Sequence, residues 1–333
     1  MRHFIRTSAL VALAALVAAV ATFAASGQPP SPTSHLVVAV LRNDGLLLPF
    51  AAFDGRKWSA PWPSSVDRYS GDLPVNLASV PRGWWGGEPP GAWTLWPRNG
   101  DPSRALALQT PVMIRVGISR QLGFRTDQPP VLPPVPPFVL PFPKVGVALA
   151  GDARVAPIAS VSAMSPTWKV FADALRPEIA KAEERSISAL NGSARWRHPF
   201  NREARRRVQS ELEAWYVTPL AGSARRLSYI EAIKKYPVLP EDDGCGLETY
   251  VSGWVHHDEG QTNLRARLRA VITYCDRRRV SYMLPFGQLE VAGKTHWIVQ
   301  MSGRDHEWYA IVEGRPDEVK YVAEFQAGRV LFE

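Results

Sequence analysis

The side chains that could hold a metal ion are concentrated in one short run, His256-His257-Asp258-Glu259. Imidazole and carboxylate groups are common ligands of divalent ions, and His296 or His306 could add a further nitrogen. Neighbouring side chains of a strand point to opposite faces, so His256 and His257 would not turn toward the same ion. The run is also expected at the tip of a hairpin, and we therefore favour a solvated polar loop over a metal site.

The sequence contains none of the common catalytic motifs. It has no HExxH, no GxSxG, no GxxxxGK[ST] and no GxGxxG placed after a strand. The acidic run Glu241-Asp242-Asp243 could supply carboxylates for acid–base chemistry, but three acids after a proline are more typical of a solvated turn. The sequence therefore names no catalytic residue and predicts no cofactor.

Three arginines alternate along one expected strand, at Arg265, Arg267 and Arg269. They share a face, because the side-chain period of a strand is two. Guanidinium groups suit bidentate anions, so this face could bind phosphate, sulfate or an acidic polysaccharide. The competing interpretation, which we favour, is a solvated face whose charges keep the sheet from pairing with other chains. The basic segment 202–207 allows the same two interpretations.

Tryptophan is concentrated between residues 58 and 96, which hold six of the twelve in the chain. Trp84 and Trp85 stand among glycines, and Trp93 and Trp96 lie together on an expected strand. Exposed indole rings are good platforms for sugar rings and proline-rich peptides. Tryptophan also fills cores beneath long loops, and that is the more frequent case. The four residues are candidates for a binding surface.

The chain has two cysteines, Cys245 and Cys275. If residues 247–256 and 264–275 form a hairpin that reverses near residue 260, the two cysteines face each other on adjacent strands. That position satisfies the Cα separation that a disulfide needs. In an oxidising compartment the bond is the expected state, and two buried thiols are the alternative.

The same hairpin register predicts which side chains share a face. One face, expected to line the core, carries Tyr250, Ser252 and Trp254 together with Leu264, Ala266, Leu268, Ala270 and Ile272. The other face places Val251, Gly253 and Val255 opposite the three arginines.

The first 26 residues have the order of a secretory signal peptide. Arg2 and Arg6 precede an unbroken apolar run, 9–21, and small residues follow at Ala24 and Ser26. An uncleaved anchor is the alternative, because 7–25 is long enough to cross a bilayer, although its alanine content makes it only marginally hydrophobic. Both interpretations export the remaining chain to the periplasm or the extracellular space, and no further membrane span is expected.

The composition is that of a folded, basic chain. Its 333 residues include 39 Lys and Arg against 31 Asp and Glu, and 46% are hydrophobic, which excludes a wholly disordered protein. Arginine outnumbers lysine by 31 to 8, which is typical of a GC-rich bacterial source. Nucleic acid is not an expected partner, because export separates the chain from it and no binding motif is present.

These candidate residues need elements to position them. The chain reads as mainly β with a helical middle, an α+β fold of antiparallel sheets. We divide it into a signal peptide 1–26, a Trp/Pro-rich antiparallel β domain 27–161, a helical connector 162–240 and an antiparallel meander with a disulfide hairpin 241–333. The connector is expected to hold helices at 167–190, 201–216 and 228–236. A further hairpin is expected to join 144–150 to 154–161.

The sequence thus predicts an exported, non-catalytic binding or structural module of the bacterial envelope or extracellular space. Its expected partner is a glycan or an envelope protein, bound through the Trp-rich loops. The alternative is an extracytoplasmic hydrolase whose site forms only in the fold. A deep cleft that gathers His and acidic side chains would favour the hydrolase, whereas a shallow surface of tryptophans and arginines would favour binding.

Overall fold

The computed structural model describes residues 35–60, 91–116, 119–131, 142–191, 197–240, 244–259, 263–304 and 306–329, all within one compact unit, Thr33–Glu333. The expected signal peptide, Trp84, Trp85 and the acidic run 241–243 lie outside the described residues. No helix in the described part is long and apolar enough to cross a membrane. The described chain is mostly antiparallel β-structure, which confirms the expected fold class at that level.

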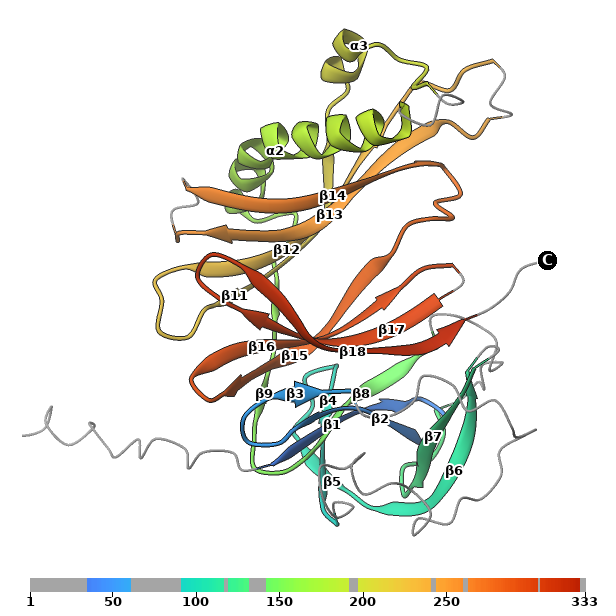
Figure 1. The fold of residues 1–333 in the computed structure, drawn as a ribbon, viewed down its shortest axis with the longest axis vertical. Coiled ribbons are helices and arrows are strands. Elements are labelled where there is room, and N and C mark those ends of the chain that lie inside the picture. The colour runs from blue at the N-terminus through green and yellow to red at the C-terminus, as the bar shows by residue number, and fades with distance from the viewer. Residues whose placement is uncertain are drawn as a thin grey trace, which may run out of the picture. The chain divides into compact units, whose positions relative to one another are not determined.

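Eight strands form the first sheet, which we name sheet I (Figure 1). Its strands follow the order β5-β4-β8-β1-β2-β7-β6, and the short β3 pairs with β2. The strands are β1 (Leu36–Arg42), β2 (Leu46–Phe53), β3 (Trp58–Ser59), β4 (Trp93–Pro97), β5 (Arg104–Leu106), β6 (Leu108–Val116), β7 (Ser119–Thr126) and β8 (Lys144–Ala150).

Two further sheets of five strands each follow in the chain. Sheet II has the order β10-β11-β12-β13-β14, with β10 (Ala159–Ser160), β11 (Glu211–Pro219), β12 (Arg226–Lys235), β13 (Leu247–His257) and β14 (Leu264–Tyr274). Sheet III has the order β18-β17-β16-β15-β9, with β9 (Val155–Ala156), β15 (Tyr282–Val291), β16 (Lys294–Ser302), β17 (His306–Gly314) and β18 (Val319–Arg329). Two helices, α2 (Pro166–Asn191) and α3 (Arg202–Arg207), complete the described elements.

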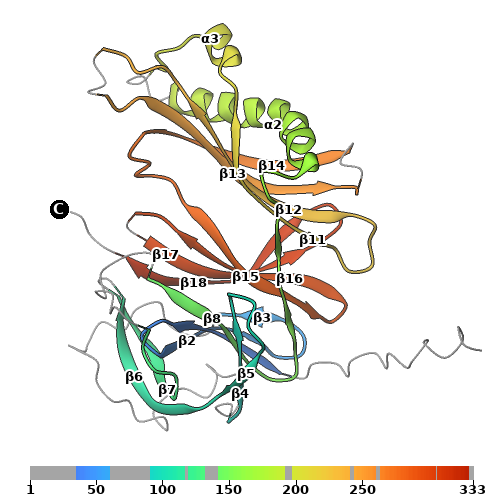
Figure 2. The same ribbon diagram turned by 180° about the vertical axis from the view of Figure 1, so that it is seen from behind.

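Three hydrophobic cores show which layers are in contact (Figures 1 and 2). One core joins sheet I to sheet III, and a second joins sheet III to sheet II, where the rings of Trp254 and Trp297 lie 5.0 Å apart. The third joins sheet II to α2, where Phe171 stacks on Trp215 at 4.0 Å. Sheets II and III are therefore each covered on both faces.

The helix α2 confirms the expectation of a helix at 167–190. Ser165 precedes it, and its side chain accepts a hydrogen bond from the backbone N–H of Thr167 at 3.4 Å, while Pro166 occupies the first turn, where its missing N–H is not needed. Apolar residues at helical spacing, Phe171, Leu175, Ile179 and Ala182, face sheet II.

The two other expected helices are largely wrong. The helix expected at 201–216 begins after Asn201, which caps the N–H of Ala204, but α3 ends at Arg207 because Val208 is extended, and β11 follows. The segment expected as a helix at 228–236 is the strand β12. Because β12 is buried on both faces, its apolar residues do not alternate, and the capping serine and the terminal proline resemble helix boundaries.

The expected hairpin between 144–150 and 154–161 does not form. The strand β8 pairs with β1 and β4 in sheet I, whereas β9 pairs with β15 in sheet III and β10 with β11 in sheet II. The C-terminal meander is also divided, since β13 and β14 extend sheet II while β15 to β18 form sheet III. The residues after Ala150 therefore link all three layers.

The hairpin of β13 and β14 forms with a register one residue away from the expected one. Val251 pairs with Ala270 and Val255 with Ala266, and these residues pack against α2. Trp254 pairs instead with Arg267, on the face that meets sheet III. A shift of one residue exchanges the two faces of a strand, so the partners expected for the arginines are wrong.

Candidate functional site

The described tryptophans of the expected binding surface belong to the core of sheet I. Trp93 and Trp96 both lie on β4; Trp93 is buried, and Trp96 is half-buried against the same core. Their indole Nε1 atoms are buried and have no hydrogen-bond partner within the described part of the chain. Trp93 and Trp96 therefore act here as apolar filling rather than as an exposed platform.

The three arginines of β14 are exposed on the edge strand of sheet II. Arg265 forms an ion pair with Asp317 at 2.5 Å, and Arg225 binds the same carboxylate at 2.6 Å. Arg267 and Arg269 have no ion pair with any described residue. Exposed charge on an edge strand fits the role of preventing sheet-to-sheet pairing.

His256 and His257 are buried on opposite faces of β13, which corrects the expectation of a solvated loop at a hairpin tip. Burial lowers the pKa of both imidazoles. The His257 ring contacts Ser228 Oγ at 2.8 Å through Nε2 and the Asp258 carbonyl at 2.9 Å through Nδ1. Trp215 Nε1 donates to the same Ser228 Oγ at 2.8 Å.

This Ser228–His257 contact has the distance of a nucleophile and its general base. Both residues are nevertheless almost completely buried beneath α2, and the Phe171 ring lies 5.2 Å from the His257 ring. The hydrogen bonds from Trp215 to Ser228 and from His257 to a carbonyl leave this polar group satisfied inside the core. Within the described residues no group of three or more His, Cys, Asp and Glu side chains could hold a metal ion.

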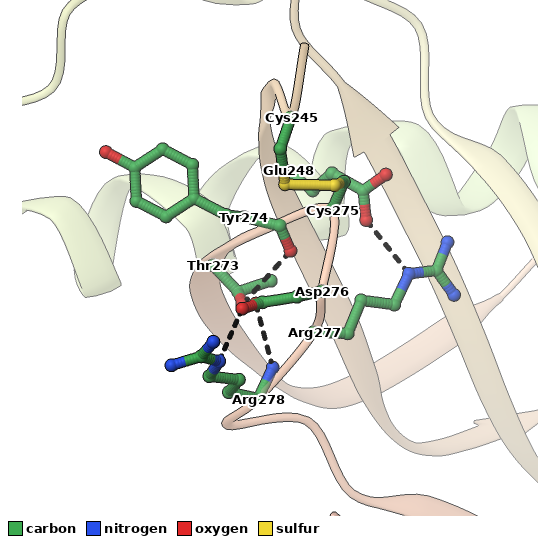
Figure 3. The surroundings of a disulfide bond; sticks show 8 residues. All are labelled: Cys245, Glu248, Thr273, Tyr274, Cys275, Asp276, Arg277 and Arg278. Carbon is green, nitrogen blue, oxygen red and sulfur yellow. Dashed lines mark hydrogen bonds and ion pairs between the residues drawn. A yellow bond between two sulfur atoms is a disulfide. The ribbon is translucent and has the colours of Figure 1, made fainter. Parts of the chain in front are cut away.

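Cys245 and Cys275 form a disulfide with Cα atoms 5.3 Å apart. It closes the open end of the hairpin, where the N–H of Cys275 donates to the carbonyl of Gly246. Figure 3 shows the turn that follows, with Arg277 directed toward Glu248 on one side and Tyr274 and Arg278 on the other. Arg277 Nε donates to Glu248 at 2.9 Å.

A basic cavity of about 450 Å³ lies where α2, α3 and β12 meet. Two short segments supply most of its charge, the middle of α2 and the arginine-rich α3. Its wall carries six cationic side chains against two carboxylates; the cations are Lys181, Arg185, Arg202, Arg205, Arg206 and Lys234, and the carboxylates are Glu183 and Glu184.

The floor of this cavity is a buried hydrogen-bonded network. Lys234 Nζ lies 2.5 Å from Glu183 Oε2 and donates to the carbonyl of Arg205 at 2.9 Å. Tyr236 Oη donates to the other oxygen of Glu183 at 2.5 Å, and burial raises the pKa of this phenol, so it remains a donor. Arg205 Nη2 donates to both carboxylate oxygens of Glu184, at 2.8 and 2.9 Å. The two carboxylates are thus neutralised within the protein.

Lys181 pairs with Glu178 at 2.6 Å, but the other three cations of the cavity have no carboxylate of their own among the described residues. Arg206 forms no ion pair with any described residue, and Arg202 comes only within 4.0 Å of Glu184, which Arg205 already occupies. Arg185 donates to a carbonyl, that of Leu268 on β14, at 3.1 Å. The cavity therefore has a surplus of positive charge on a rigid base, an arrangement suited to carboxylate, sulfate or phosphate.

The sequence indicates only the arginine-rich part of this site. The arginines of α3 stand out in the sequence as a possible anion-binding group, but the expected helix through Tyr216 would place them elsewhere. Lys234 and Tyr236 come from a segment that the sequence predicts to be a helix. No signal in the sequence marks Glu183 and Lys234 as a pair, because other charged residues lie close to each of them in the chain.

Another carboxyl group has unusual acid–base properties. Glu231 of β12 is buried toward sheet III and accepts a hydrogen bond from the N–H of Met283 at 2.7 Å. Burial raises the pKa of Glu231 to about 7, against the lowering effect of that hydrogen bond. Nearby, Arg277 donates to both carboxylate oxygens of Glu213, at 2.9 and 3.1 Å. Glu231 does not belong to the wall of the basic cavity.

No protein-family model, no curated protein and no solved structure matches the chain.

Proposed function

We propose that the protein is an exported, non-catalytic binding module of the bacterial envelope or extracellular space that holds an acidic glycan in the basic cavity. The observation that carries this proposal is the unbalanced charge of the cavity. Arg206 and Arg202 line it, and the two carboxylates of its wall are already paired with other cations. Its volume is that of an ordinary small-ligand site and suits one or two sugar rings better than a macromolecular surface.

The export part of the proposal rests on the leader-like first 26 residues and on the disulfide, which is stable in oxidising compartments. Expression of the full chain in a bacterial host, followed by N-terminal sequencing of the protein recovered outside the cytoplasm, tests it. We expect a mature chain that starts at Gly27. Recovery of full-length protein in the cytoplasm with reduced cysteines would contradict export.

The binding part is tested by calorimetric titration with oligogalacturonates, whose uronic acids carry carboxylates, and with neutral cello-oligosaccharides. We expect saturable binding of the acidic series only, weakened by added salt. Arg206→Gln should weaken it by about tenfold, because a hydrogen bond to a charged group is lost.

Arg207→Gln is the matched control for this test. Arg207 lies on the same helix, is exposed like Arg206, and its loss changes the net charge equally, but it pairs with Glu203 and lies outside the cavity wall. If both substitutions weakened binding of the acidic series equally, the effect would be one of overall charge, and the proposed site would be wrong. Binding of the neutral series with the same affinity would also contradict the proposed site.

A hydrolase remains the alternative proposal, and one observation favours it. Glu231, with its raised pKa, and Glu213, which pairs with Arg277, resemble the two carboxyl groups in different surroundings that glycosidases use. The burial of Glu231 between two sheets speaks for the binding module. Release of reducing sugar by the wild type but not by Glu231→Gln would establish the hydrolase.

A further inference from the structure

A second hollow, of about 440 Å³, lies at the open end of the disulfide hairpin, and it shares no lining residue with the basic cavity. Its apolar part is formed by Leu190 in the last turn of α2, Leu247 of β13 and Ile272 of β14. Leu247 pairs with Tyr274, and Ile272 precedes Tyr274 by two residues, so all of these strand residues face the side of sheet II on which α2 packs.

The apolar part of the hollow meets a charged rim. Tyr274 is 48% exposed, which is unusual for so large a side chain in this protein, and it stands at the edge of the hollow with Arg278 and Arg279. Arg278 is neutralised by Asp276, whose carboxylate lies 2.6 Å from its Nε. Arg279 forms no ion pair with any described residue. Within the described residues, the rim therefore carries one positive charge that no carboxylate compensates, next to apolar surface.

The turn that presents this rim is held from both sides (Figure 3). The disulfide ties its first residue, Cys275, to Cys245, and the N–H of Arg277 donates to the carbonyl of Tyr274 at 2.9 Å. The Arg277 side chain is fixed on the far side by Glu248 and Glu213. A turn fixed in this way loses little conformational freedom when a ligand binds.

We propose that this hollow is a second binding site, for a small amphipathic carboxylate that carries one negative charge on a short apolar body. The apolar body contacts Leu190, Leu247, Ile272 and the ring of Tyr274, and the carboxylate accepts from the guanidinium of Arg279. Charge complementarity selects a monoanion, because Asp276 and Arg278 compensate each other and only Arg279 is left to pair with a negative group. The site is independent of the acidic-glycan proposal.

Titration of the oxidised protein with octanoate, followed by amide NMR shifts, tests the site. We expect saturable, one-to-one binding with shifts at residues 272–279. Octanamide has the same body without the charge, and acetate has the charge without the body, so both should bind at least about tenfold more weakly. Equal affinity for octanoate and octanamide, or absence of saturable octanoate binding, would overturn the proposal.

Two variants locate the binding. Arg279→Gln should reduce octanoate affinity to that of octanamide. Arg267→Gln removes an exposed arginine of the same hairpin that lies outside the hollow and has no ion pair with a described residue, so it should leave octanoate affinity unchanged. Ile272→Ser should weaken octanoate and octanamide alike. Arg206→Gln, in the basic cavity, should have no effect, so this site and the glycan site succeed or fail separately. Octanoate binding that is indifferent to Arg279→Gln would show that the ligand lies elsewhere.

Discussion

The Glu231 side chain makes the stability of the packing between sheets II and III depend on pH. Its carboxyl group is buried between sheets II and III, and burial raises its pKa from 4.5 to about 7. The unfolded chain releases this proton at lower pH than the folded chain does. The stabilisation is therefore complete below about pH 4.5 and is lost as the pH rises through 7.

This titration predicts a measurable difference between the wild type and Glu231→Gln. From pH 4.5 to pH 8 the wild type should lose about 3 kcal/mol of unfolding free energy more than the variant, which cannot ionise there. Urea denaturation at several pH values measures it. Buried histidines, such as His296 with its pKa lowered to about 4 by burial, act in the opposite direction in both proteins, so only the difference isolates Glu231.

Glu259→Gln is the control for this comparison, because the Glu259 side chain is 81% exposed. It should reproduce the pH dependence of the wild type. A variant Glu231→Gln whose stability falls with pH as steeply as that of the wild type would show that the carboxyl is already ionised in the folded protein.

In the hairpin of β13 and β14, the sequence predicts the strand ranges but not the register in which the two strands pair. Its two strand ranges follow from β-branched and aromatic residues and from the polar turn, and the sequence predicts both to within one residue. Its faces are not predicted, since pairing of His257 with Leu264 places the strands one residue away from the expected register. The cysteines still meet, because adjacent positions of a hairpin end are close enough for a disulfide.

Removal of the disulfide should act on this element first. In the chain-entropy account, closing a loop across the 30-residue separation of the cysteines contributes roughly 3 to 4 kcal/mol, so Cys245→Ala/Cys275→Ala should lower the unfolding free energy by about that amount. Urea denaturation of the variant, with the reduced wild type as its control, measures the loss. The sheets themselves should remain, as judged by far-ultraviolet circular dichroism. A variant as stable as the oxidised wild type would contradict this expectation.

At the scale of the whole molecule, the three sheets are linked by long-range contacts. Lys144 of β8 and Glu307 of β17 form a fully buried ion pair at 2.7 Å between sheets I and III, and Glu307 also accepts from Tyr309 at 2.6 Å. Gln121 of sheet I donates to the carbonyl of Gln326 of sheet III at 2.7 Å. Buried ion pairs favour one arrangement over others, because an unpaired charge in this position would be costly.

The sequence by itself determined the antiparallel β-rich class, the helix α2, most strand positions and the cysteine pair. These depend on local signals, namely turns with glycine such as Ala292-Gly293, runs of β-branched residues and a cap with proline before a helix. Only the tertiary structure decided that β12 is a strand, that the C-terminal strands divide between two sheets and that α3 stands beside α2. Burial on both faces removes the alternation that marks a strand, and a cavity is formed by residues distant in sequence. Lys234, which pairs with Glu183, and Arg206 line one cavity although they come from separate segments of the chain.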